Sequence, residues 1–206
     1  MISHLQKRMY SSKHYISSIS AIDYIAGFRD TDKFIVFCKQ CNKYEHCWAC
    51  PPFTFPADDY INGYEYVYII GTKIVFAEET RTQNTSLEKN KEIARHAIAE
   101  VRRKLDQQLL ALEKDIAGSK VFFAGTCHLC DENDCTRVHN EPCRYPEKIR
   151  PSLEAFGFDI GKTSEKLLNI ELKWSHDGLL PEYLTLVSGL FTNAVVAGAE
   201  KYFTEK

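Results

Sequence analysis

Eight cysteines in two tight groups constrain this 206-residue chain more than any other feature of its sequence. The first group, C-x2-C-x5-C-x2-C, occupies positions 38, 41, 47 and 50, and the second, C-x2-C-x4-C-x7-C, occupies positions 127, 130, 135 and 143. Two residues between cysteines form a short turn in which both sulfurs can reach one centre while backbone N–H groups point back at them. The spacing therefore predicts two cysteine-rich loops that bind metal.

The spacing within the groups favours an iron–sulfur cluster over zinc. Zinc ribbons and fingers usually separate their two C-x2-C pairs by about 12 to 20 residues, whereas only five residues separate Cys41 from Cys47. Iron–sulfur sites favour close cysteines with a more remote fourth and a proline after a ligand, as in Cys50-Pro51. We expect a cluster in at least one group, with zinc in both groups as the alternative.

Composition and charge exclude several classes of protein. Hydrophobic residues make up 44% of the chain and charged residues 26%, which is typical of a folded globular protein. The net charge of -2 predicts no nucleic-acid partner. No apolar run approaches the roughly 18 residues that span a bilayer, and the start of the chain lacks the apolar core of a secretory signal. We therefore expect a cytoplasmic protein with no membrane partner, in which clustered thiols indicate metal and not disulfides.

Hydrophobic patterning predicts an α+β fold, with a mixed or antiparallel sheet, one long amphipathic helix and two cysteine-rich metal loops in a single domain over 1–206. The helix is expected over 86–116, where apolar residues recur at spacings of three and four, with a Thr85–Glu88 capping box at its start and Gly118 at its end. Strands are expected over 33–38, 64–79, 119–127 and 180–192, short helices over 151–157 and 164–172, and a flexible segment over 1–13. Two of the strands would each end at the first cysteine of a group.

Three longer motifs resemble those of a family of prokaryotic cysteine-rich proteins described as predicted metal-binding proteins of unknown function. They are C-x2-C-x2-Y-x3-W-x-C-P-P over 38–52, G-T-C-x2-C over 125–130, and P-C-R-Y-P-E-K-I-R-P-S-L-E-A-F-G-F-D-I over 142–160. The similarity runs from about residue 35 to residue 190. It implies a bound metal, with a 4Fe-4S cluster as the expected form, and it implies no established reaction.

The resemblance marks seven cysteines as metal ligands that hold the cofactor: Cys38, Cys41, Cys50, Cys127, Cys130, Cys135 and Cys143. Cys47 falls where the family pattern is variable. Seven thiolates do not fill two four-thiolate sites, so either Cys47 completes the first site or that site keeps an iron open to water, substrate or another ligand such as His46. An open coordination position is what separates catalytic metal sites from structural ones.

Competing interpretations apply to six other residues near the cysteines. Each histidine can bind metal or be a solvated loop residue, each arginine can hydrogen-bond sulfur or pair with a nearby glutamate, and each aromatic can shield the first site or pack in the core. The residues are His128, His139, Arg144, Arg150, Trp48 and Phe53.

Three functions are compatible with this pattern. The first is a redox or electron-transfer accessory protein that carries one or two 4Fe-4S clusters and meets a redox protein partner. The second is a zinc-stabilised interaction module, and the third is an enzyme or metal carrier with an open coordination site. The sequence shows no nucleotide-binding or zinc-protease motif and does not decide whether the protein is an enzyme.

Overall fold

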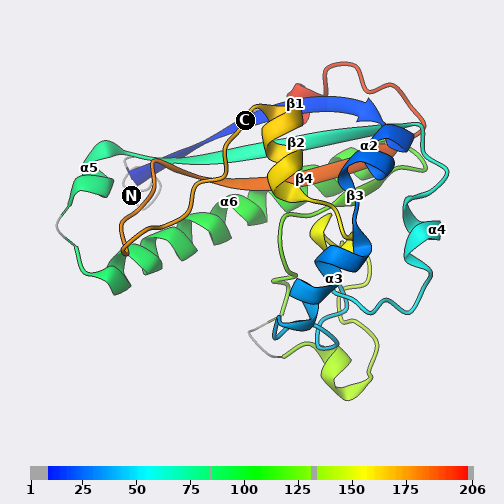
Figure 1. Cartoon of the computed structure of the whole chain (residues 1–206), viewed down its shortest axis with the longest axis horizontal. Coiled ribbons are helices and arrows are strands. Elements are labelled where there is room, and N and C mark those ends of the chain that lie inside the picture. Colours follow the sequence, from blue (N-terminus) through cyan, green and yellow to red (C-terminus); the bar gives the residue numbers. More distant parts are fainter. Residues whose placement is uncertain (1–8, 84, 131–133, 204–206) are drawn as a thin grey trace.

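The centre of the molecule is an antiparallel four-stranded sheet with strand order β1-β2-β4-β3 (Figure 1). It is seen in a computed structural model that describes residues 9–83, 85–130 and 134–203. The strands are β1 (Tyr10–Ser20), β2 (Tyr66–Phe76), β3 (Lys120–Phe122) and β4 (Tyr183–Thr192). Together with the helices, this sheet confirms the predicted α+β class.

Helices cover both faces of the sheet because the strands alternate their apolar side chains between two cores. On β2, Val67 and Ile69 pack in a core with α2 (Ala21–Phe28) and α7 (Ile160–Leu168). Their neighbours Tyr68 and Ile70 point the other way, toward α6. Since both faces are covered, the middle strands are buried along most of their length.

The long amphipathic helix is confirmed as α6 (Leu87–Asp115), whose apolar stripe lies along the sheet (Figure 1). The predicted capping residue is wrong by one position. Ser86 is the N-cap, and its hydroxyl accepts a hydrogen bond from the backbone N–H of Lys89 at 3.3 Å. Thr85 instead donates its hydroxyl to Asn90 Oδ1 at 2.5 Å. The helix is over before Gly118, which has the left-handed φ of 74° that favours glycine.

The strand predicted over 33–38 is wrong, because this segment lies in helix α3 (Thr31–Lys39). The apolar run has β propensity, but Asp30 caps a helix here by accepting a hydrogen bond from the Lys33 backbone N–H at 3.0 Å. Phe37 remains 60% exposed on this helix. The first cysteine group therefore follows a helix and not a strand.

The strands β2, β3 and β4 were predicted, with two differences in extent, whereas β1 was missed because its serine-rich sequence has no clear apolar alternation. β2 runs unbroken through Gly71, where an added Cβ would lie 2.6 Å from Leu168 Cδ1, so glycine lets α7 approach the sheet closely. β3 is only three residues long, and the chain leaves it well before Cys127. Residues 10–13 lie in β1, whereas residues 1–8 of the segment expected to be flexible lie outside the described residues.

The remaining elements are short. The helix predicted over 151–157 is the single 3-10 turn η2 (Glu154–Phe156), which Gly157 ends at a φ of 85°. The helix predicted over 164–172 is α7, which begins and ends four residues earlier. The others are α4 (Ala57–Ile61), α5 (Glu78–Thr82), η1 (Thr136–His139) and η3 (Ala199–Phe203).

All the cysteines except Cys38, which lies in the last turn of α3, are on two long connections that meet away from the sheet, at the lower end of the view in Figure 1. The first connection joins α3 to α4, and the second joins β3 to η2 and contains η1. Among the described residues, no helix combines the length and the apolarity that crossing a bilayer requires.

Candidate metal centre

Thiols from both cysteine groups come into contact at one point. Cys47 and Cys50 are buried with Ala49 in a small cluster, against which Cys127 packs. The Cys47 sulfur is hydrogen-bonded to the thiols of Cys127 and Cys50. The structure thus joins two groups that the sequence presents as separate, and it places Cys47, which the family pattern omits, between them.

Contact between the three thiols shifts their pKa values in opposite directions. The thiols of Cys127 and Cys50 both donate to the Cys47 sulfur, and this holds the pKa of Cys47 far below its ordinary value. Because they act as donors to Cys47, and because Cys50 is buried and Cys127 partly buried, the pKa values of Cys50 and Cys127 are raised. The thiolate, the form that binds metal, is therefore already stabilised at the middle of the three.

The other cysteines surround this contact. Burial, followed by the neighbouring Cys41, raises the pKa of Cys38 at the end of α3. Burial also raises the pKa of Cys143, which lies within electrostatic reach of Cys135 and Cys130. Cys41 is exposed, while the others outside the buried pair are partly exposed. All seven predicted ligands thus lie in the same region of the molecule, and the eighth cysteine lies at its centre.

Backbone N–H groups donate to three of the sulfurs, and each of the three has a donor two residues further along the chain. The Cys47 sulfur has a second backbone donor, from Cys127. Ala49 donates to Cys47, and Leu129 donates to Cys127. The Tyr145 N–H lies 3.4 Å from the Cys143 sulfur. Such bonds stabilise a thiolate and are part of what tunes thiolate-bound metals. The chemistry of these donors therefore fits a metal held by thiolates.

Arg137, from the second connection, ties the two cysteine loops together. Its guanidinium donates to the carbonyls of Cys47 at 2.7 Å and Cys50 at 2.6 Å, and also to the carbonyl of Pro52. It lies over the Trp48 ring, 5.4 Å from the centroid. Sequence reasoning missed this residue because its partners are some 90 positions away, and only its place between two cysteines could have drawn attention to it.

Trp48 adds a second link between the loops. Its indole Nε1 donates to the carbonyl of Glu141 at 3.1 Å. Phe53, the other aromatic predicted to shield the site, stacks on Phe156 at a centroid distance of 4.7 Å and faces the sheet core. Trp48 therefore covers the cysteine loops, whereas Phe53 belongs to the packing beside them.

Two of the candidate histidines are engaged in hydrogen bonds. His46 is exposed, and its Nδ1 lies 2.7 Å from the carbonyl oxygen of Tyr44. The Nε2 of His128 lies 2.7 Å from Asp106 Oδ2, which anchors the start of the second cysteine group on α6. His139 is exposed in η1.

The two arginines near the second group have acidic partners other than the glutamates expected. Arg144 pairs with Asp134 at 2.6 Å and also approaches the Cys130 sulfur. Arg150 forms a bidentate pair with Glu113 on α6. Arg144 thus lies at the cysteines, while Arg150 fastens the end of the second connection to the long helix.

Residues of the right chemistry are gathered here, but they do not surround a single ion. Within residues 9–83, 85–130 and 134–203, no three side chains of His, Cys, Asp or Glu have the arrangement needed to hold one metal ion. The contacting thiols are arranged by hydrogen bonds to one another and to the backbone. What the structure shows is a set of thiolate donors drawn from both groups.

Comparison with known proteins identifies the family. Comparisons with curated proteins and with solved structures gave no match. A family model described as "Predicted metal-binding protein (DUF2284)" matches residues 26–191, a range that contains all eight cysteines and Arg137. The chain therefore belongs to this family of predicted metal-binding proteins.

Proposed function

We propose that this protein binds one or two 4Fe-4S clusters with thiolates from both cysteine groups and serves as a cytoplasmic redox accessory that exchanges electrons with a protein partner. The observation that carries the proposal is the contact between Cys47, Cys50 and Cys127, which joins the two groups. The backbone N–H groups that donate to the sulfurs also support the proposal, because they stabilise thiolate, the form of cysteine that binds iron–sulfur clusters.

Iron–sulfur chemistry is supported by the composition of the site. The eight cysteines gathered in this region all have free thiols. The two nearby histidines already have partners, since His46 Nδ1 contacts the carbonyl of Tyr44 and His128 Nε2 contacts Asp106. Thiolate-rich sites with a proline after a ligand are typical of clusters, and Pro51 follows Cys50. A bound cluster would supply one-electron transfer. The chain buries Cys47 and Cys50 but exposes Cys41, so a partner would approach from the Cys41 side.

Zinc remains a second candidate because the contacting sulfurs are so close together. Four thiolates bound tetrahedrally at a Zn–S distance of about 2.3 Å lie about 3.8 Å from one another. Cys47, Cys50 and Cys127 pack against one another directly, with no other group between them. Ligands of a cubane cluster lie farther apart, since iron and sulfide lie between them. In this case the protein would be an interaction module whose loops are held by zinc.

Anaerobic purification followed by metal and sulfide analysis distinguishes the two candidates. A cluster gives brown protein that absorbs near about 400 nm, bleaches with dithionite and becomes paramagnetic on reduction. A zinc protein is colourless. Protein isolated without oxygen that contains neither iron nor sulfide would overturn the cluster, and the absence of zinc as well would overturn both candidates.

Substitution of single cysteines tests whether both groups contribute. We expect Cys47→Ala and Cys50→Ala to lose metal equally, because both thiols are buried in the same contact. Thr126→Ala is a suitable control, since Thr126 is exposed beside Cys127 and offers no thiol. Full metal content in Cys47→Ala would show that the contact between the groups is not the binding site.

A further inference from the structure

Two charged side chains, one turn apart on α6, hold the chain on either side of Cys127. The Nη2 of Arg102 donates to the carbonyl of Thr126 at 2.5 Å. Asp106 contacts the ring of His128 through the hydrogen bond described above. Residues four positions apart lie on the same face of a helix. The long helix therefore fixes both chain neighbours of this cysteine.

The guanidinium of Arg102 is partly buried and has no close carboxylate. Its Nε is shielded from solvent and has no hydrogen-bond partner among the described residues, and the side chain makes no ion pair with any of them. Burial lowers its pKa, but an arginine side chain stays protonated in proteins. By contrast, Arg144 and Arg150 both pair with carboxylates. A cation removed from water without an anion is destabilising, so the position of Arg102 favours an anion nearby.

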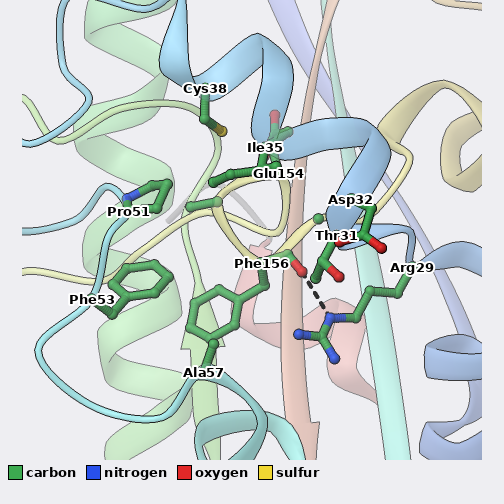
Figure 2. Close-up of a pocket in the computed structure, with 12 residues that line it drawn as sticks. Arg29, Thr31, Asp32, Ile35, Cys38, Pro51, Phe53, Ala57, Glu154 and Phe156 are labelled. Carbon is green, nitrogen blue, oxygen red and sulfur yellow. Dashed lines mark hydrogen bonds between the residues drawn. The ribbon is translucent and has the colours of Figure 1, made fainter.

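Three acidic groups lie within electrostatic reach of this guanidinium, namely Asp106, Glu154 and the thiol of Cys127. Asp106 is engaged with His128. Glu154 lies next to α3, in the wall of a small cavity that Cys38 also lines (Figure 2). Burial raises the pKa of the Glu154 carboxyl and so favours its neutral form. The remaining anion is the thiolate that Cys127 forms when it binds metal.

We propose that Arg102 is the countercharge of the metal centre, a positioning residue that holds Cys127 in place and offsets the negative charge of the metal-bound thiolates. This proposal rests on the proposed function, because it needs metal at the thiolates. Centres ligated by thiolates carry excess negative charge. Charges and hydrogen bonds around the ligands tune the metal affinity and the reduction potential of such centres.

Two substitutions of Arg102 separate its charge from its hydrogen bond. Arg102→Gln removes the charge, Arg102→Lys keeps it, and both replacements carry N–H donors for the Thr126 carbonyl. Arg103→Gln is the matched control, since Arg103 is exposed at the next position of α6. Each full-length variant is purified without oxygen, circular dichroism checks that it is folded, and its iron, sulfide and zinc are measured beside those of the unmodified protein.

The rate of metal release to excess EDTA is a readout that serves for either metal. We expect Arg102→Gln to release metal about 10-fold faster or more, since groups behind a ligand usually contribute about 10- to 100-fold to metal affinity. Arg102→Lys and Arg103→Gln should stay within about 3-fold of the unmodified protein, because the nearby charge is kept in the first and was exposed in the second.

For protein that contains a cluster, the reduction potential is a second readout, measured by titration with dithionite in the presence of redox dyes. A nearby cation favours the reduced form, which carries one more negative charge. Arg102→Gln should therefore be about 10-fold harder to reduce, a shift of about 59 mV to more negative potential for one electron. Arg102→Lys should restore most of that shift, which a purely mechanical role of Arg102 does not predict.

Failure of this proposal is distinguishable from failure of the proposed function. Equal metal release from Arg102→Gln and Arg103→Gln, or from Arg102→Gln and Arg102→Lys, would overturn the countercharge alone, since the unmodified protein would still contain iron and sulfide. Zinc in place of iron, released faster from Arg102→Gln, would overturn the cluster alone. Absence of both metals from the unmodified protein would overturn both proposals.

Discussion

The sheet with α6 and the region of the two cysteine groups are stabilised in different ways. The sheet is held by long antiparallel ladders and by fully buried residues such as Ile69, Phe122 and Leu109. The cysteine region has little regular structure, and among its described residues the buried apolar cluster consists of Cys47, Ala49 and Cys50. Contacts between its two connections are made largely by thiols, Arg137 and Trp48. The first part can fold by apolar burial, whereas we expect the second to need bound metal to become equally stable.

Loss of metal should therefore have the largest effect, and that effect should be confined to the cysteine region. We expect Cys127→Ala, or chelation of the metal, to raise amide hydrogen exchange of residues 38–53 and 127–145 by at least about 100-fold, because ligand loss removes the free energy that couples metal to local folding. Exchange in β2 and β4 should not change. Mass spectrometry of peptides from the unmodified protein, the variant and the Thr126→Ala control measures this. An equal increase of hydrogen exchange in β2 and β4 would contradict the division of the molecule into two separately stabilised parts.

The opposite experiment removes an aromatic side chain from the sheet core. Phe122 is fully buried and packs edge-on against Phe156. Phe122→Ala should lower the free energy of unfolding by about 3–5 kcal/mol, from lost burial and the cavity that remains. Urea unfolding followed by circular dichroism measures the change. Phe37→Ala is the matched control, since that ring is 60% exposed and its loss should have little effect. Loss of metal from Phe122→Ala while the sheet is still folded would show that the two parts are coupled.

Arg137 is the residue whose loss should loosen the cysteine region without removing a thiol. Arg137→Gln loses charged hydrogen bonds to carbonyls of the first loop, including those of Cys47 and Cys50. We expect a loss of about 2–3 kcal/mol of local stability, seen as faster exchange of amides 47–53, together with faster release of metal to a chelator. Lys104→Gln, at an exposed position on α6, controls for the loss of a positive charge. If amides 47–53 exchange at the same rate in Arg137→Gln as in Lys104→Gln, Arg137 does not stabilise the cysteine region.

Regular elements could be predicted from the sequence where one local pattern extends over many residues. The helix α6 shows this best, since its apolar stripe repeats along its whole length. Its predicted ends were close, because the N-cap is Ser86, one position after the predicted Thr85, and the helix ends shortly before Gly118. In α3, by contrast, a short apolar run has β propensity while the Asp30 cap favours a helix. A segment of nine residues gives too little periodicity to decide between the two, and the cap should have carried more weight.

The candidate metal centre could be predicted only in part, because spacing along the chain says which cysteines lie close in sequence and not which loops meet. The pairs within each C-x2-C turn follow from local geometry. The contact of Cys47 with Cys127 and the bonds from Arg137 to the first loop join residues 80 to 90 positions apart, and they depend on how the two connections pack. The sequence also left open whether Cys47 belongs to the first site, and its burial beside Cys50 is visible only in the folded chain.

The smallest of these effects should come from the pair of His128 and Asp106, which links the two parts of the molecule. His128 follows Cys127, the first residue of the second cysteine group, and its Nε2 lies 2.7 Å from the Oδ2 of Asp106 on α6. Loss of this hydrogen bond in His128→Asn should lower the free energy of unfolding by about 1 kcal/mol. Because the bond joins a loop to a rigid helix, the loss should appear mainly as faster exchange of amides 127–130 and hardly at all in α6.

A double-mutant cycle with Asp106→Asn measures how much of that change belongs to the pair. His96→Asn serves as the control, because His96 is exposed on the same helix. If the two single substitutions add without coupling, His128 does not anchor the second group through Asp106. Packing of Cys127 against Cys47 and the bonds from Arg137 and Arg102 would then have to hold that loop on their own, and the cysteine region would be even more dependent on metal than the comparison with the sheet implies.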